Sequence, residues 1–476
     1  MAKSFTYREI KHQKEKVIWL FPLTVWVVVL IGLPLYGDDI TFLDFYNSMS
    51  LYEYINFRWE TWSSRIFIDT VAAWMCAHPL IYQGLTVIIL FSLSYIILHC
   101  AKRIYPTCNV SFLVISLCAC YPISLYKWAF IADSINYLWP LAFLLYNLYY
   151  IQNYIFFRDQ EKSKKSGIHF VALCLLLLSQ IFMNDQEQLW CCWLIILFSI
   201  TICYYLSCKK VHGFLLISLL ICILSGVGKA LCPGTKVRLQ SNIAAYMPEF
   251  PMWSITDKFI IANVRMFKQL IAYPKVWILI CTGIFLILCV KKKNNTIVRL
   301  CALYTFLLTW TYFFKGIVVS ATEPYGGKLY VLVTKMLFVP EDIRNGSFSV
   351  ENCLSVILWL VFCFCIVYEV HFVCRDWHKF LIALIALACG YTSMLMMAFS
   401  PTIYASDVRT LTFVLVGFLI LDVLLLCEAL KDNELITSVR GGIVALTVFL
   451  CICATVYQGS YLHAFAQSSF LYSISV

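Results

Sequence analysis

Two adjacent aspartates, Asp38 and Asp39, stand directly after the first apolar segment of the chain. That segment, residues 17–36, is long enough to cross a bilayer, and a polar, aromatic stretch follows it as far as Arg65. Carboxylates beside a membrane are costly, because each one loses hydration and repels its neighbour. The pair therefore indicates chemistry or ion handling and predicts an enzyme that works at the outer face of the membrane. Asp39 is the expected base, since Asp38 lies nearer to the end of the segment, although the reverse order stays open.

The residues that flank this pair are expected to stand on apolar helices. The chain has 476 residues, of which 62% are hydrophobic and 13% charged, whereas about 25% of an ordinary soluble domain is charged. We therefore predict an all-α polytopic membrane protein, a single membrane domain over 1–476, with about 13 (11–14) transmembrane helices. The expected spans are 17–36, 80–101, 109–126, 136–157, 168–183, 189–207, 212–230, 275–290, 297–314, 352–373, 380–399, 410–429 and 441–460.

The charge distribution gives the expected orientation. With the N-terminus inside, the inner segments carry a net charge of +11 and the outer side −1, which together make the formal net charge of +10. Short inner loops rich in Lys and Arg are typical of cytoplasmic loops. We therefore expect a multi-pass protein of the cell membrane with a cytoplasmic N-terminus, a first span that stays as an anchor, and no binding of nucleic acid.

The longer connecting pieces fall on the predicted outer side. The first outer loop, 37–79, holds the acidic motif and an apolar segment, 66–76, that reads as an interfacial helix. The loop 231–274 holds the run Pro-Gly-Thr-Lys-Val-Arg and then 255–273, whose spaced charges predict an amphipathic surface helix. Elaborate outer loops and short inner ones predict that the protein works outside.

Polar residues in turns between predicted spans also fall on this side, and their coincidence predicts one polar cleft ringed by helix ends. They are Asp133, Asn136 and Tyr137 before the fourth span, Asn184 and Glu187 between the fifth and sixth, Lys236 and Arg238 after the seventh, and Arg409 before the twelfth.

Such a cleft suits transfer from a lipid-linked phosphate donor. A carboxylate can take the proton of an acceptor hydroxyl, and Arg238, Lys236 and Arg409 are the residues expected to hold the leaving phosphate. Aromatic side chains such as Trp62 and Tyr137 can cover sugar faces or lipid. Structural roles remain as alternatives: Arg65 as an anchor for its helix, Glu187 as part of the scaffold, Asp133 as a helix cap. A salt bridge to Asp407 is the alternative for Arg409.

These motifs resemble the GT-C superfamily of polytopic glycosyltransferases, and more narrowly a bacterial GT-C-like membrane family of largely uncharacterised function. That narrower family is similar in its early acidic pair, its W-S-x-R, N-Y-x-W-P and N-D/E-x-x motifs and its P-G-N-x-x-R motif. The matching residues here are Asp38-Asp39, Trp62-Ser63-Ser64-Arg65, Asn136-Tyr137-Leu138-Trp139-Pro140, Asn184-Asp185-Gln186-Glu187 and Pro233-Gly234-Thr235-Lys236-Val237-Arg238, with Ser400-Pro401 and Arg409 further on. Thr235 departs from the usual asparagine. The resemblance covers about residues 1–410 and implies a GT-C-like fold, a polyprenyl-phosphate-sugar donor and a cell-surface glycan acceptor.

Three functions therefore stay in competition. The first is a membrane glycosyltransferase that uses a polyprenyl-phosphate sugar and needs no cofactor, although adjacent carboxylates also suit a divalent cation. The second is a flippase or transporter of lipid-linked glycans, which would need charged residues deep inside spans. Such residues are scarce: Lys229, Glu369 and Asp422 are the few candidates, and they lie mostly near span ends. The third is a polysaccharide polymerase or ligase. The early aspartate pair favours the first.

Overall fold

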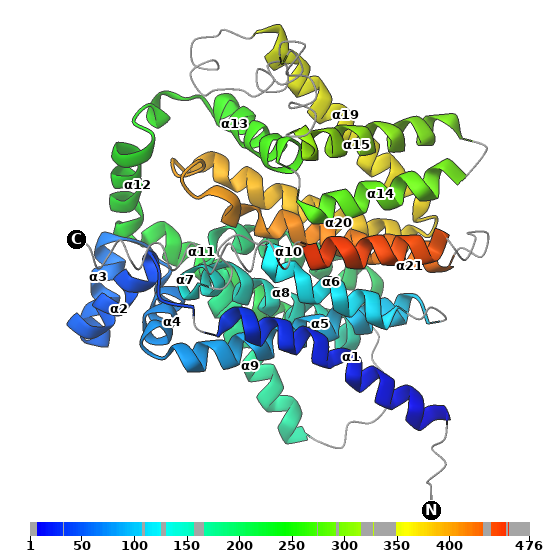
Figure 1. Ribbon diagram of the computed structural model, residues 1–476. Helices are drawn as coiled ribbons and strands as arrows, with labels where there is room; N and C mark the ends of the chain where they lie inside the picture. Colours follow the sequence, from blue (N-terminus) through cyan, green and yellow to red (C-terminus); the bar gives the residue numbers. More distant parts are fainter. Residues whose placement is uncertain are drawn as a thin grey trace, which may run out of the picture. The chain divides into compact units, whose positions relative to one another are not determined.

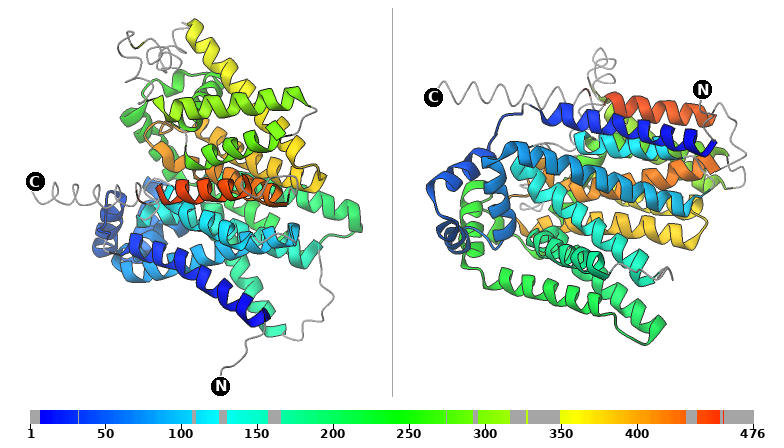
Figure 2. Two further views of the ribbon diagram at one scale, coloured as in Figure 1. Left: turned by 45° about the vertical axis from the view of Figure 1, so that its right-hand side comes forward. Right: turned by 90° about the horizontal axis from the view of Figure 1, so that it is seen from below.

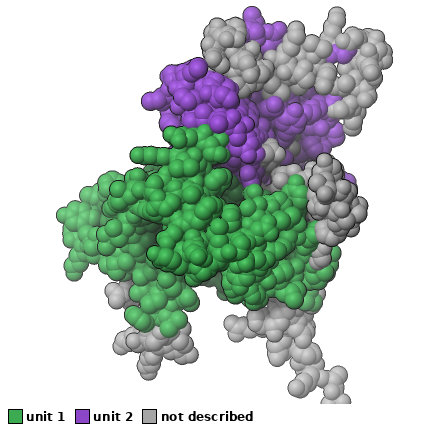
Figure 3. Space-filling view, turned by 90° about the vertical axis from the view of Figure 1, so that its left-hand side faces the viewer, with its two compact units in different colours: residues 1–100, 114–242, 455–476 green, residues 101–113, 243–454 purple. Residues whose placement is uncertain are grey.

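The computed structural model describes residues 7–31, 33–106, 110–124, 130–156, 166–273, 275–291, 295–315, 327, 349–431, 439–453 and 456. Throughout these residues the regular structure is helical, as the apolar sequence predicts (Figure 1). The chain forms two compact units. Unit 1 comprises residues 1–100, 114–242 and 455–476, and unit 2 comprises 101–113 and 243–454; they are coloured separately in Figure 3. The expected single membrane domain stays a prediction.

Seven described helices are long and apolar enough to cross a membrane, and the pair 255–272 with 276–290 makes an eighth if it is one span. They match seven of the predicted segments. These helices are α5 (Pro79–Ile104), α10 (Glu187–Cys208), α11 (Gly213–Leu231), α15 (Thr296–Phe313), α19 (Val350–Val373), α20 (Trp377–Met396) and α21 (Thr412–Lys431).

The other predicted segments also fall largely on helices. These are α1 (Tyr7–Leu30), α6 (Ser111–Ser124), the helix 131–156, α9 (Ser166–Asp185), α14 (Val276–Lys291) and the apolar helix Val439–Cys453. The ends of the predicted spans at 109, 125–126, 157 and 457–460 lie outside the described residues. A membrane protein is the interpretation that the exposed apolar surface favours: Phe198, Leu220 and Leu224 are more than half exposed on α10 and α11. The full number of spans stays a prediction.

In unit 1 the first predicted outer loop folds into short helices. They are α2 (Asp38–Ser48), α3 (Leu51–Thr61) and α4 (Ile66–Ala77). Ser50 and Glu53 form a capping box that fixes the start of α3. Figures 1 and 2 show these helices at one end of the long helices of unit 1, together with the start of α12 (Pro233–Tyr246).

The helix 131–156 has two wide turns. It consists of α7 (Ile131–Asp133), the π-helix η1 (Ser134–Leu138), α8 (Trp139–Tyr150) and the π-helix η2 (Ile151–Phe156). Wide turns of this kind are rare and are often found at functional sites. Here the first one carries two of the predicted site residues, Asn136 and Tyr137.

Unit 2 packs around α21, which is buried along nearly all of its length between α14 and α20. Gly390 of α20 and Gly417 of α21 allow the close crossing of these two helices. A Cβ at Gly390 would lie 2.8 Å from Val414 Cα, and one at Gly417 would lie 2.8 Å from the Ala386 carbonyl oxygen. Small residues at helix crossings are common in membranes because they let backbones approach. The predicted surface helix 255–273 is present as α13 (Ile255–Phe267) and the π-helix η4 (Lys268–Ala272), but Arg265 on it is buried.

Candidate functional site

Asp39 is the second residue of α2 and is almost wholly buried. Gly37 precedes the pair with φ +56°, a left-handed conformation that glycine adopts without a steric penalty, so the chain can turn sharply from the first apolar segment into α2. Asp38 is exposed, whereas Asp39 points into unit 1. The turn therefore gives the two adjacent carboxylates opposite environments.

The Asp39 carboxylate accepts hydrogen bonds from the backbone at the start of the helix 131–156. Ala132 N donates to Oδ1 at 2.7 Å, and Ile131 N donates to Oδ2 at 3.3 Å. Tyr36 N also donates to Oδ2, at 3.4 Å. Burial raises the pKa of Asp39 to about 7, with the Ala132 N–H opposing the shift and the nearby Asp133 adding to it. Asp39 thus anchors a helix start that follows it by more than ninety residues.

The same helix connects Asp39 to a second group of predicted residues. One turn after Ala132, Asn136 donates from Nδ2 to the Ala132 carbonyl oxygen at 2.7 Å and accepts from Arg65 Nη1 at 3.1 Å. Asp133 and Tyr137, on either side of Asn136, are half-buried. The wide turn therefore places the Asn136 amide against Arg65, while the start of the same helix is bonded to Asp39.

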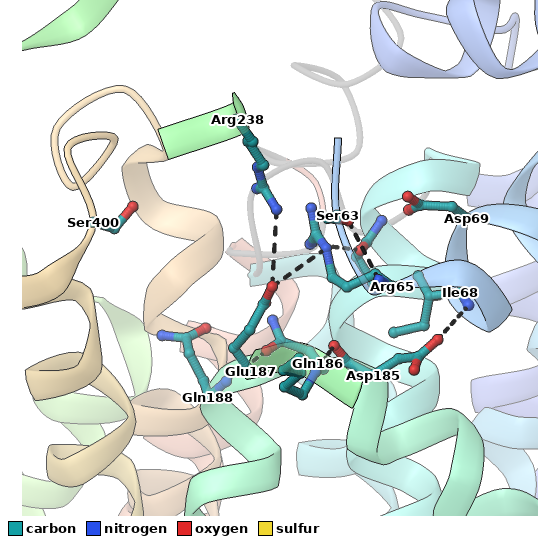
Figure 4. A network of polar contacts seen from close by, with 12 residues as sticks. Ser63, Arg65, Ile68, Asp69, Asp185, Gln186, Glu187, Gln188, Arg238 and Ser400 are labelled. Atoms are coloured by element: carbon teal, nitrogen blue, oxygen red, sulfur yellow. Dashed lines mark hydrogen bonds and ion pairs between the residues drawn. The ribbon is translucent and has the colours of Figure 1, made fainter. Parts of the chain in front are cut away.

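Glu187 lies between two arginines from distant parts of unit 1. Its Oε1 is 3.7 Å from Arg65 Nε and 3.8 Å from Arg238 Nη1, as Figure 4 shows. The Glu187 side chain is 44% exposed, so this cluster of Arg65, Glu187 and Arg238 is accessible. Trp62, at the end of α3, has its ring 5.5 Å from the Arg238 guanidinium.

Burial and the charge of Arg65 lower the pKa of Arg238 to about 10, and Glu187 opposes that shift. Arg238 therefore stays protonated at neutral pH. The cluster has two cations and one anion, and its ion-pair distances are longer than those of direct charge-assisted hydrogen bonds. Such a site can attract a further anion.

The run that carries Arg238 begins a helix instead of forming a backbone turn. Pro233 is the first residue of α12, a position where its missing N–H costs nothing. A Cβ at Gly234 would lie 2.5 Å from Trp62 N and 2.6 Å from the Trp59 carbonyl oxygen, so glycine is required for α12 to rest on the end of α3. Arg238 is positioned by this close packing.

Of the other residues predicted to hold phosphate, Lys236 lies on a different face of α12 from Arg238, and Arg409 belongs to the other unit. Lys236 is exposed and stands two positions before Arg238, about 200° around the helix. Arg409 belongs to unit 2, where its Nε donates to the Ser406 carbonyl oxygen at 3.1 Å in the 3-10 helix η7 (Asp407–Leu411). A phosphate contact by Arg409 stays a prediction.

Two charged residues near the cluster were not among the predicted site residues. Asp185 is buried in the turn before Glu187, and its Oδ2 accepts from Phe67 N at 2.7 Å and Ile68 N at 3.2 Å. Burial raises the pKa of Asp185 to about 7, against the opposing effect of Lys229. Lys229, near the end of α11, donates from Nζ to the Asp185 carbonyl oxygen at 2.8 Å. A lone lysine in an apolar span and an aspartate inside the quoted motif were the available signals.

Two further buried groups complete the surroundings. Neither amide atom of Asn184, which is fully buried, has a hydrogen-bond partner among the described residues. Arg58 and Asp69 form a buried ion pair, with Arg58 Nε 2.8 Å from Asp69 Oδ2, that joins α3 to α4. This pair braces the two helices on either side of Trp62 and Arg65.

Comparisons of the chain with protein-family models, curated proteins and solved structures find no match.

Proposed function

We propose that this protein is a membrane glycosyltransferase that moves a sugar from a polyprenyl-phosphate donor to a glycan or glycopolymer of the cell surface. The observation that carries the proposal is the accessible cluster in which Arg65 and Arg238 share Glu187, with Lys229 nearby. Guanidinium groups can hold a phosphate leaving group through charge-assisted hydrogen bonds and stabilise the charge that develops on it. The work would take place on the extracytoplasmic side, as the charge distribution of the sequence predicts.

In this scheme the acceptor hydroxyl oxygen attacks the anomeric carbon of the sugar. The bond from that carbon to the phosphate oxygen breaks, the phosphate keeps the electron pair, and Arg65 and Arg238 stabilise its charge. The hydroxyl proton passes to a carboxylate. Because protein cations hold the leaving group, the scheme requires no resident metal.

Asp39 stays our predicted base. A pKa of about 7 suits a group that must accept a proton at neutral pH. The space that Asp39 lines has a volume of about 10 Å³, enough for about one water. To receive a proton, Asp39 would have to exchange one of its longer bonds, to Ile131 N or Tyr36 N, for the acceptor hydroxyl.

The test is sugar transfer by the purified protein from synthetic polyprenyl-phosphate sugars, with and without EDTA. Arg238→Ala should lower the transfer rate by at least a hundredfold, because one charged stabiliser of the leaving group is removed. Asp39→Asn tests the base. Arg103→Ala is the matched control, because Arg103 is an exposed arginine in the last turn of α5. This variant should leave the transfer rate unchanged. Full activity of both Arg238→Ala and Asp39→Asn would overturn the mechanism.

A transporter of lipid-linked glycans is the second candidate, because two carboxylates on candidate spans of unit 2 are fully buried. Glu369 on α19 and Asp422 on α21 are fully buried. Thr305 donates to Glu369 Oε1 at 3.1 Å, while neither Asp422 oxygen has a hydrogen-bond partner among the described residues. Ionisable groups inside membranes often mark transport pathways. Movement of a lipid-linked glycan across vesicles, together with no transfer from any donor, would favour this candidate.

A polymerase or ligase would differ in its acceptor. Transfer between two lipid-linked glycans, and none to a free glycan, would favour that alternative.

A further inference from the structure

Unit 1 contains an apolar groove of about 660 Å³, bounded by α3, α4, α9 and α11. This volume lies within the range of known small-molecule sites, about 300–1,000 Å³. Its walls are almost entirely hydrocarbon and aromatic. They include Leu51, Ile55, Trp59, Phe67, Ile181 and Leu224.

The polar groups of the groove come from the neighbourhood of the arginine cluster. Asp185 and Lys229 both line it, as does Ser64, the residue before Arg65. Asp185 stands two residues before Glu187, and Figure 4 shows the two side chains pointing to different partners. The Lys229 ammonium lies within electrostatic range of Glu187. The groove therefore has apolar walls and a cationic group that belongs to the same neighbourhood as Arg65 and Arg238.

Lys229 stands among apolar and small residues of its own helix, and Glu187 and Asp185 partly balance its charge. It is near the end of a span whose preceding lining residues, Leu224, Ser225 and Gly228, are apolar or small. An ammonium group in such a helix is expensive and is usually retained for a ligand or a partner. Its described hydrogen bond goes to a backbone carbonyl oxygen, which a phosphate oxygen could replace as the stronger acceptor.

We infer that this groove binds the terminal part of a polyprenyl chain and that Lys229 contacts the phosphate attached to it. The inference rests on the proposed function and adds a location for the lipid of the donor. Polyprenyl phosphate is the proposed ligand because its anion is joined directly to a single hydrocarbon chain. That chemistry matches one groove whose apolar wall on α11 runs directly up to a lysine. A phospholipid carries two chains on a glycerol that separates them from the phosphate.

Binding is measured with a photoreactive polyprenyl monophosphate and the full-length protein in phosphatidylcholine nanodiscs. Crosslinks are expected in peptides that contain residues 51–71 or 221–229. Unlabelled polyprenyl phosphate should compete, and phosphatidylglycerol should compete at least tenfold more weakly.

Gly228→Leu is the principal variant, because a Cβ at Gly228 meets nothing within 4 Å and the larger side chain can enter the groove without displacing the fold. It should weaken binding at least tenfold, and Lys229→Gln should do so by about tenfold. Gly213→Leu is the matched control: its Cβ also meets nothing within 4 Å, and it lies at the start of the same helix and is not among the groove residues. It should leave binding unchanged. Thermal unfolding of each variant verifies folding.

Crosslinks confined to other segments, unchanged binding in Gly228→Leu, or equal competition by phosphatidylglycerol would each overturn the inference. The readout requires no sugar transfer, so the two proposals can fail separately. Transfer activity without lipid in the groove would leave the proposed function standing. Lipid in the groove without transfer from any donor would leave the lipid site standing and remove the transferase.

Discussion

Asp39 and Asp185 make the same kind of contact in two regions of unit 1. Each is buried, and each accepts N–H groups at the start of another helix, Asp39 from Ile131 and Ala132 and Asp185 from Phe67 and Ile68. Burial raises the pKa of both to about 7.

The surroundings of the two aspartates differ. Asp39 has the carboxylate of Asp133 as its charged neighbour and lines a space of about 10 Å³. Asp185 has Lys229 beside it and lines a groove of about 660 Å³. The same kind of helix anchor thus stands in two settings, beside a space for about one water at Asp39 and beside a cation and an open groove at Asp185. The proposed lipid and phosphate contacts therefore gather around Arg65, Glu187, Lys229 and Arg238, while Asp39 stays the predicted base.

The largest expected effect is on the pH dependence of stability. For each aspartate the pKa rises from 3.8 when unfolded to about 7 when folded. Between these values the unfolded state loses its proton first, so the free energy of unfolding falls as pH rises from about 4 to 7, by up to roughly 4 kcal/mol per group. Above pH 7 this contribution is constant. Asp39→Asn and Asp185→Asn should each make the fall shallower in unfolding experiments in detergent between pH 4 and 8.

Lys229→Gln distinguishes the two regions in the same measurement. Loss of the Lys229 ammonium should raise the pKa of Asp185 further. The part of the stability profile that is due to Asp185 should then move to higher pH. The part due to Asp39 should stay in place. An identical response of both parts would contradict the comparison.

The next effect comes from removal of the carboxyl groups themselves. Asp39→Ala removes the acceptor of three backbone N–H groups and Asp185→Ala that of two, and each should lower the free energy of unfolding by about 2–3 kcal/mol. Hydrogen exchange should increase locally, in residues 131–136 for the first variant and 66–70 for the second. Asp44→Ala, at an exposed position of α2, is the control. Uniformly faster exchange across unit 1 would show that these contacts are not local anchors.

The smallest effect is expected at Glu187. Its charge holds Arg65 and Arg238 near each other at 3.7 and 3.8 Å, yet its side chain is 44% exposed, so solvent weakens both ion pairs. Glu187→Gln should lower the affinity for polyprenyl phosphate by about tenfold or less and leave the free energy of unfolding nearly unchanged. Titration with the lipid in nanodiscs measures this change. A loss of affinity well beyond tenfold would contradict this weak, solvent-screened role of Glu187.

Much of the fold follows from local properties of the sequence. The apolar segments 80–101, 189–207 and 352–373 are found on α5, α10 and α19, since the length and hydropathy of a helix are set by consecutive residues. The division into two compact units was not predicted, because it depends on which helices pack together.

The candidate site was predictable in part. The motif resemblance included Arg65, Asn136, Glu187 and Arg238, which the structure brings together through one hydrogen bond and two ion pairs. Lys236 was grouped with Arg238 because they belong to the same short run of the sequence, but helix geometry separates positions two residues apart by about 200°. Asp185 was overlooked because its partners, Phe67 N and Ile68 N, are backbone groups that no residue pattern displays.

By itself the sequence determined that the chain is helical and apolar, where its helices run, and that acidic and basic residues follow their ends. Composition and periodicity decide these features, and both are local. Tertiary packing places the Asp39 carboxylate on the backbone N–H groups that start the helix 131–156. It also brings Glu187 to Arg65 and Arg238 and places Lys229 in the wall of an apolar groove. The physical reason is that burial and charge pairing depend on the packing of segments far apart in the chain.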